Sequence, residues 1–154
     1  MKNYLKVILF VVLIVCCFNF VACSNYESEI CDVKTLKTHL IETNELTEGE
    51  SLSLLKVYSN KIYNGKSATI VKFEILLDEN ESEDGSIILG GNISDWALIV
   101  GNDIQFLRDY NHAVNKNDKT TMQNNKDVNF AVQLILNGDK TWKEINTKKI
   151  QDKI

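Results

Sequence analysis

The stretch that decides the fold is SLSLLKVYSNKIYNGKSATIVKFEILL, residues 51–77. Asn64-Gly65 lies at its centre, and this dipeptide is typical of a type I′ hairpin turn because both central positions of that turn need positive φ. On the outgoing strand, alternate residues fall on opposite sides, which predicts one buried face. The expected core face consists of Thr69, Val71, Phe73, Ile75 and Leu77, and the other face of Ala68, Ile70, Lys72 and Glu74.

The segment before the hairpin predicts an amphipathic helix. In DVKTLKTHLIET, residues 32–43, apolar side chains recur at helical spacing, and Asp32 is expected to cap the helix N-terminus. The expected apolar face consists of Val33, Leu36, Leu40 and Ile41. We expect this face to pack on the domain's own sheet rather than on a partner.

Three further segments after the hairpin carry strand and helix signals. Residues 86–111 predict three short strands with turns at Gly90-Gly91 and Gly101-Asn102-Asp103, although the part from Ser94 could instead be helical. Residues 128–145 predict a second hairpin. Its incoming strand alternates, its turn is Asn137-Gly138-Asp139 and Trp142 lies on its return strand; the alternating residues are Val128, Phe130, Val132 and Leu134. Residues 146–154 predict a short terminal helix.

Two polar segments predict loops. DENESEDG, residues 78–85, is acidic and begins with Asp78, Asn80 and Ser82 at calcium-loop spacing, but Glu83 and Leu89 stand where that motif needs glycine and glutamate. We therefore predict a solvated loop and no metal. HAVNKNDKTTMQNNKD, residues 112–127, predicts a long polar loop that is locally basic through its lysines Lys116, Lys119 and Lys126.

Taken together, these signals predict an α+β protein with one amphipathic helix followed by a mainly antiparallel β-sheet domain of about seven short strands. The predicted organisation is a signal segment at residues 1–22, a flexible tether at residues 23–30 and a single domain at residues 31–154. The absence of proline leaves every tight turn to Gly, Asn or Asp.

The charge excludes some classes of partner. The chain of 154 residues carries a formal charge of −4. Removing residues 1–22 removes Lys2 and Lys6 but no acidic residue, which takes the charge to −6. That balance argues against a nucleic-acid binder, which needs a basic face, and against an electrostatic membrane-surface helix. It is compatible with a soluble exterior or a basic partner.

The N-terminus predicts export and lipid attachment. Two lysines precede the apolar run VILFVVLIVCCFNFVA, residues 7–22, which has the length of a secretory segment and is short for a membrane span. FVAC, residues 20–23, resembles a bacterial lipobox at Ala22 and Cys23 and departs from it at Phe20. We expect cleavage after Ala22 and acylation of Cys23. Cleavage after Ser24 and an uncleaved anchor are the alternatives.

The remaining chemistry-bearing residues do not form a recognisable catalytic or metal-binding pattern. Cys31 is the only thiol left after Cys23, so an internal disulfide framework is not expected. It could be a reactive thiol, an intermolecular bridge or an inert half-buried thiol. His39 and His112 have no partner at metal-ligand spacing. We therefore expect a protein without enzymatic activity, cofactor or metal.

The lipobox, the near absence of arginine and proline, and the Lys/Asn/Ile-rich mature chain make the protein similar to the surface lipoproteins of Borrelia spirochaetes. The likeness covers residues 1–23 by motif and the rest by composition. It implies display on the bacterial outer membrane, immunogenicity, and binding of host proteins such as complement regulators or matrix components.

The functional hypothesis is a lipid-anchored adhesin or host-protein binder, held in the membrane by its acyl chains. The expected ligand patch consists of Lys116, Lys119, Lys126 and Trp142. Core positions for Trp96 and Trp142 are the competing interpretation. The alternative function is a periplasm-facing lipoprotein that assists envelope assembly or inhibits an enzyme.

Overall fold

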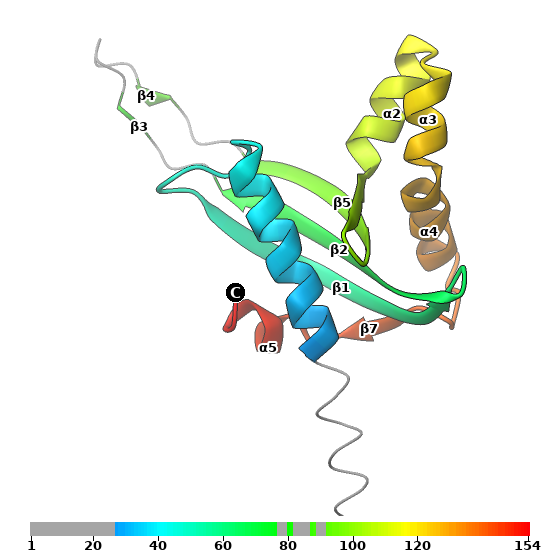
Figure 1. Cartoon of the computed structure of the whole chain (residues 1–154). Helices are drawn as coiled ribbons and strands as arrows, with labels where there is room; N and C mark the ends of the chain where they lie inside the picture. The colour runs from blue at the N-terminus through cyan, green and yellow to red at the C-terminus, as the bar shows by residue number, and fades with distance from the viewer. Residues whose placement is uncertain (1–26, 77–79, 82–86, 89–91) are drawn as a thin grey trace, which may run out of the picture.

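The computed structural model describes residues 27–76, 80–81, 87–88 and 92–154 (Figure 1). The predicted signal segment, the predicted acylation site Cys23, the predicted cleavage site Ala22 and the first part of the predicted tether lie outside the described residues. So do Leu77, the turn Gly90-Gly91 and most of the acidic loop.

The domain is built on an antiparallel sheet, which confirms the predicted α+β class. Its strands are β1 (Ser51–Tyr63), β2 (Lys66–Leu76), β5 (Asn92–Val100), β6 (Asp103–Phe106) and β7 (Lys143–Ile145). They lie in the order β6-β5-β2-β1-β7, so the main sheet has five strands rather than about seven. The short strands β3 (Asn80–Glu81) and β4 (Ile87–Ile88) pair only with each other among the described residues.

The β1–β2 hairpin is confirmed, including its turn. Asn64 has a φ of 50° and Gly65 a φ of 79°, and Tyr63 pairs with Lys66, as a two-residue type I′ turn requires. The β5–β6 turn is also confirmed, with Gly101 at a φ of 64° in its first central position. The strand β5 rules out the helical alternative from Ser94.

The N-terminal helix (residues 27–42) covers one face of the sheet, as predicted (Figure 1). Val33, Leu36 and Leu40 are fully buried, and they share a core with Val57, Val71, Phe73, Ile75, Ala97, Ile99 and Ile150. Two details of the prediction are wrong. Ile41 is 52% exposed, and Asp32 lies inside the helix, where it accepts a hydrogen bond from Thr69, because residues 27–30 are already helical.

The opposite face of the sheet is also buried, which the sequence did not predict. Ala68 and Ile70 on β2 and Leu98 on β5 are almost fully inaccessible. They pack against Val128, Ala131 and Val132 of α4 (Lys126–Leu136). The sheet therefore carries helices on both faces, and its central strands are apolar on both sides.

Residues 107–136 form helices where the sequence predicted a loop and a strand. They comprise α2 (Leu107–Lys116), α3 (Lys119–Asn124) and α4. The predicted strand face at 128–134 is wrong because Phe130 points outward, whereas Val128, Ala131 and Val132 follow helical spacing. Asn137-Gly138 is a helix end rather than a hairpin turn. Asp139 N–H donates to Leu134 C=O, and Gly138 has a φ of 78°.

The outer edge of β1 is covered along much of its length. The strand β7 pairs only with Val57–Ser59. On one side of it, the side-chain amide of Gln151 in α5 (Thr147–Gln151) accepts from Leu54 N–H at 2.8 Å and donates to Leu52 C=O at 2.9 Å. On the other side, Asn60 Oδ1 accepts from Ile62 N–H at 3.0 Å. These contacts satisfy backbone groups that would otherwise template strand addition. The helix α5 also confirms the predicted terminal helix.

Candidate functional site

Two of the predicted patch lysines bracket the turn between α2 and α3. Lys116 is the last residue of α2, Lys119 is the first of α3, and both are exposed. This α2–α3 turn lies at the top of the molecule in Figure 1, whereas the N-terminal helix begins at the bottom. Lys126 is exposed too, but it begins α4 at the far end of α3. The structure thus brings two of the three lysines together.

The α2–α3 turn is held by its own hydrogen bonds. Asn117 ends α2 in the left-handed region at a φ of 55°, and Asp118 N–H donates to Ala113 C=O at 2.9 Å. Asp118 then caps α3, since its carboxylate accepts from the backbone of Thr120 and Thr121 and from the Thr121 hydroxyl. The Thr121 hydroxyl is the main reason that the pKa of Asp118 lies below its ordinary value. A capped turn holds the backbone that carries the two lysines in one conformation.

The fourth predicted patch residue, Trp142, does not join the lysines. Its side chain is only 5% exposed and belongs to the core beneath α4, where its ring lies 5.2 Å from that of Tyr63. The core interpretation of Trp142 is therefore the correct one. Trp142 therefore cannot contribute an aromatic side chain to a ligand patch at the α2–α3 turn.

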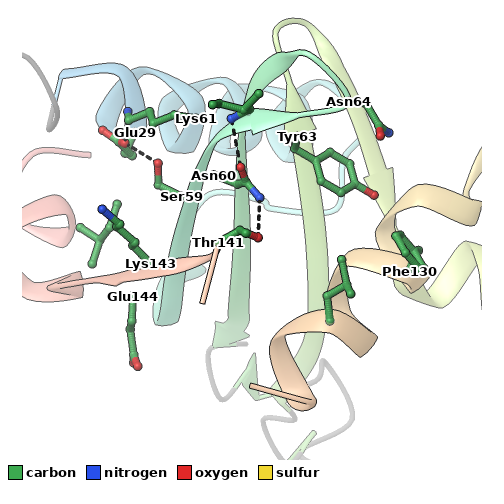
Figure 2. A pocket seen from close by; sticks show the side chains of 13 residues that line it. Glu29, Ser59, Asn60, Lys61, Tyr63, Asn64, Phe130, Thr141, Lys143 and Glu144 are labelled. Atoms are coloured by element: carbon green, nitrogen blue, oxygen red, sulfur yellow. Dashed lines mark hydrogen bonds and ion pairs between the residues drawn. The ribbon is translucent and has the colours of Figure 1, made fainter. Parts of the chain in front are cut away.

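A pocket opens at the edge of the sheet (Figure 2). It lies where the pairing of β7 with β1 stops at Ser59 and the β1–β2 hairpin extends beyond it. Its volume is about 680 Å³, within the range of small-ligand sites. It is bordered by the start of the N-terminal helix, the end of β1, α4 and β7. Its lining includes Glu29, Ser59, Asn60, Ile62, Phe130 and Thr141.

The wall of this pocket exposes two large apolar side chains. Ile62 at the hairpin tip is 79% exposed, and Phe130 on α4 is 57% exposed. On the floor, the side-chain amide of Asn60 donates to the Thr141 hydroxyl at 3.1 Å, which links β1 to the residues before β7. These two side chains add exposed apolar area beside the concave surface.

Two acidic residues line the pocket, Glu29 and Glu144, and of these Glu29 is buried and fully engaged. Lys61 Nζ lies 2.8 Å from Glu29 Oε1, and the Ser59 hydroxyl donates to the same oxygen at 2.8 Å. Ser28 donates to the other oxygen at 3.0 Å. Burial favours a higher pKa, but the hydrogen bonds from Lys61 and Ser59 together with the others outweigh it, so the pKa of Glu29 lies below its ordinary value of 4.5. Glu29 is therefore ionised at neutral pH and is poorly suited to donate a proton.

A second buried carboxylate, Asp95, lies outside the pocket. Its Oδ1 accepts from the backbone N–H of Trp96 at 2.7 Å and of Arg108 at 3.2 Å, while its Oδ2 has only the Arg108 guanidinium, with Nε at 3.5 Å. Arg108 also pairs with Glu45 and lies over the Phe106 ring. Burial raises the pKa of Asp95 to about 6. Asp95 lines neither this pocket nor the shallow hollow beside Cys31.

The remaining candidates of the sequence do not converge. Cys31 is exposed and free rather than half-buried. His39 stacks on Phe106 at 5.7 Å, and His112 lies exposed on α2. Within the described part of the chain, no three His, Cys, Asp or Glu side chains are grouped so that they could hold a metal ion.

Sequence reasoning missed the pocket because no local signal marks it. Its lining comes from residue 29, residues 59–64, residues 130–134 and residues 141–145, which only the tertiary fold brings together. No protein-family model, curated protein or solved structure matches this chain. Among the helices of the described residues, none is long and apolar enough to cross a membrane.

Proposed function

We propose that this chain is a lipid-anchored, non-enzymatic bacterial surface protein that binds a host protein through the α2–α3 turn. The observation that carries the proposal is the position of Lys116 and Lys119. Both lysines are exposed on a capped turn, at the end of the molecule opposite the start of the N-terminal helix (Figure 1).

The proposed anchor would fix which end of the domain points outward. Four peptide steps separate Cys23 from Glu27, where the described helix is already formed. At a maximum of about 3.5 Å per step, the acylated residue lies within about 14 Å of that helix end. The start of the N-terminal helix would then stay near the bilayer, and the α2–α3 turn would project away from it.

The chemistry of the α2–α3 turn suits an acidic partner surface. Two lysines held on the same capped turn attract carboxylates and increase the rate of association with an acidic partner. Val114, in the last turn of α2, is 46% exposed and adds apolar area next to them. The ionised, paired state of Glu29 and the position of Asp95 outside the pocket support a binding role over acid–base catalysis.

The anchor is tested by the intact mass of the mature protein extracted from its host in detergent. We expect residues 23–154 plus two or three acyl chains, and loss of these chains in Cys23→Ala. Protease treatment of intact cells should degrade the protein. An unmodified chain that begins at Asn25 would contradict the anchor, and protection from protease would instead support the periplasm-facing alternative.

The binding role is tested with immobilised host complement regulators and matrix proteins. We expect the double variant Lys116→Glu/Lys119→Glu to lose at least about tenfold in affinity for a bound partner, because two attractive charges become repulsive. The matched control is Lys140→Glu/Lys153→Glu, which makes the same charge change at exposed positions outside the α2–α3 turn. Equal losses in both variants would show that the α2–α3 turn is not the contact.

A further inference from the structure

We propose that the end of the domain opposite the α2–α3 turn lies on an anionic lipid surface, with Ile62 and Phe130 at the boundary between headgroups and acyl chains. This basal surface is defined by Ile62, Phe130, Lys140, Lys143 and Lys148. The proposal rests on the proposed acyl anchor, and it adds a direct contact between the folded domain and the membrane.

The first argument is the reach of the chain outside the described residues. Glu29 lines the same pocket as Ile62 and Phe130 (Figure 2). Because Cys23 lies within about 14 Å of Glu27, an acyl chain on Cys23 brings this pocket to the headgroup region. The α2–α3 turn lies at the other end of the molecule (Figure 1) and is therefore held further from the anchor.

The second argument is the apolar area beside the anchor. Ile62 at 79% exposure is the most exposed large apolar side chain in the described part of the chain, and Phe130 faces the same pocket. Aromatic and branched apolar side chains of this kind insert at the boundary between headgroups and acyl chains. Their placement at the tip of a hairpin and on one side of α4 allows shallow insertion without unfolding.

The third argument is the distribution of charge along the molecule. Residues 140–153 contain five lysines and only two acidic residues, Glu144 and Asp152. The helix α5 follows β7 along the edge of β1 and lies beside the middle of the N-terminal helix, since Gln151 bonds to the backbone of Leu54 and the Lys37 ammonium donates to Ile154 C=O at 2.8 Å. Residues 42–50, at the other end of that helix, contain four glutamates and no basic residue. An anionic bilayer therefore attracts residues 140–153, of which Lys143 lines the pocket, and repels residues 42–50.

The acidic groups near the basal surface do not cancel this attraction. Glu29 is paired with Lys61, and Glu144 with Lys56 at 3.3 Å. Glu27 at the helix start and Asp139 beside Lys140 oppose the attraction, but the exposed Lys140, Lys143 and Lys148 outnumber them. Each lysine near an anionic bilayer strengthens the association by about fivefold, within a distance of about 8 Å at physiological salt.

The test uses the mature chain from residue 23, which contains every residue of both hydrophobic cores. Cys23 and Cys31 are replaced by serine, and an N-terminal hexahistidine holds the protein on nickel-chelating lipid in phosphatidylcholine vesicles, with or without phosphatidylglycerol. A fluorophore is attached to Ile62→Cys or, as the matched control, to Val114→Cys. Both positions are exposed apolar residues, one on the basal surface and one beside the α2–α3 turn.

We expect a nitroxide-labelled lipid to quench the fluorophore at position 62 at least about fivefold more than that at position 114, with phosphatidylglycerol present. Lys143→Glu/Lys148→Glu should abolish this contrast, and Lys116→Glu/Lys119→Glu should leave it unchanged. Equal quenching at the two positions would overturn the proposal. A contrast that persists without phosphatidylglycerol and ignores the lysine reversals would also overturn it, because the surface would then not be recognised by its charge.

This experiment separates the lipid contact from the proposed function. The histidine anchor replaces the acyl chains, so the quenching result does not depend on whether Cys23 is acylated in the host. A native protein that carries acyl chains, together with equal quenching at both positions, would remove only the lipid contact. A native protein without acyl chains would remove the anchor and leave the measured affinity of the basal surface standing.

Discussion

Glu29 and Asp95 lie near opposite ends of the N-terminal helix, and both are almost completely buried, at 1% and 6% exposure. The pKa of Glu29 nevertheless lies below its ordinary value, while burial raises the pKa of Asp95 to about 6. The two carboxyl groups thus differ in their partners rather than in their burial.

The difference shows how closely a partner must approach to compensate for lost hydration. Lys61 and Ser59 both meet one oxygen of Glu29 at 2.8 Å. Arg108 approaches Asp95 Oδ2 only to 3.5 Å and also pairs with Glu45, so this oxygen is left without a hydrogen bond in the described structure. The loss of hydration is therefore offset at Glu29 and incompletely offset at Asp95.

The largest expected effect is the pH dependence that Asp95 gives to stability. The pKa of Asp95 is about 6 in the folded protein, against an ordinary value of 3.8. Between these two pH values the folded state keeps the proton, whereas the unfolded chain has lost it. The contribution of Asp95 to the free energy of unfolding should therefore fall as pH rises from about 4 to about 6, by about 3 kcal/mol. Urea unfolding at a series of pH values measures this slope.

The matched variant for this slope is Asp95→Asn, which keeps an acceptor for Trp96 N–H and cannot titrate. The difference in free energy of unfolding between the two proteins should change across pH 4–6, and outside this window it should stay constant. Asp32, whose pKa is also raised by burial, contributes equally to both proteins and cancels in the difference. Parallel curves for the two proteins would contradict the assignment to Asp95.

A smaller effect is expected when Glu29 loses its cation. Lys61→Met keeps the aliphatic chain and leaves a buried carboxylate whose remaining donors are two hydroxyl groups and a backbone N–H, all uncharged. We expect a loss of about 2 kcal/mol at pH 7, less than for a fully buried pair because the Lys61 side chain is 48% exposed. Chemical unfolding monitored by tryptophan fluorescence measures the change.

Two further variants identify the cause of that loss. Lys56→Met breaks the pair with Glu144, in which both side chains are about half exposed, and should leave the unfolding midpoint unchanged. Glu29→Gln added to Lys61→Met should recover part of the stability, because the buried charge is then gone. If Lys61→Met and Lys56→Met behave alike, Glu29 is not the compensated carboxylate that the structure indicates.

The sequence predicts those parts of the fold that depend on a local signal. Asn64-Gly65 specifies a hairpin because extended strands flank it, and the positive φ of both residues agrees. Asn137-Gly138 is the same dipeptide in a helix end, where Asn137 has a φ of −83° and only Gly138 is positive. The dipeptide predicts that the chain reverses direction. Whether it forms a hairpin turn or a helix end depends on whether the apolar residues before it recur with the period of a strand or of a helix.

That period is ambiguous in residues 128–135. Val128 and Val132 are four apart, which satisfies both a strand face and a helix face. Phe130 would complete the strand, whereas Ala131 completes the helix, and the buried residue is Ala131. A small residue such as Ala131 gives a weak apolar signal in the sequence, yet it lets α4 approach the sheet over Ala68 and Ile70. Residues 112–127 also give a weak apolar signal, so the sequence predicted a loop there. The polar residues Asn117 and Asp118 in fact end α2 and begin α3.

The candidate sites also divide into those that a sequence signal predicts and those that only the tertiary fold assembles. The three exposed lysines could be selected from composition, because a basic cluster in an acidic chain stands out. The Glu29–Lys61 pair spans 32 residues along the chain, and the pocket collects side chains from four separate segments. No spacing rule connects such residues before the fold is known. Trp142 was selected for its chemistry, but its place in the core depends on Tyr63 and α4.

The smallest effect that still separates the two carboxylates is expected from Ser59→Ala. The Ser59 hydroxyl donates to Glu29 at 2.8 Å, and no side-chain hydroxyl donates to Asp95 in the described structure. Loss of one charge-assisted hydrogen bond should lower the free energy of unfolding at pH 7 by about 1.5 kcal/mol. The pKa of Glu29 is held down by this bond, so the loss belongs to the ionised form and should vanish as pH falls through that pKa. Ser53→Ala, at a half-buried serine of the same strand, should cost much less and show no such pH dependence. If the cost of Ser59→Ala is the same at pH 3 as at pH 7, the hydroxyl serves packing alone, and the low pKa of Glu29 then depends on Lys61 and the other donors.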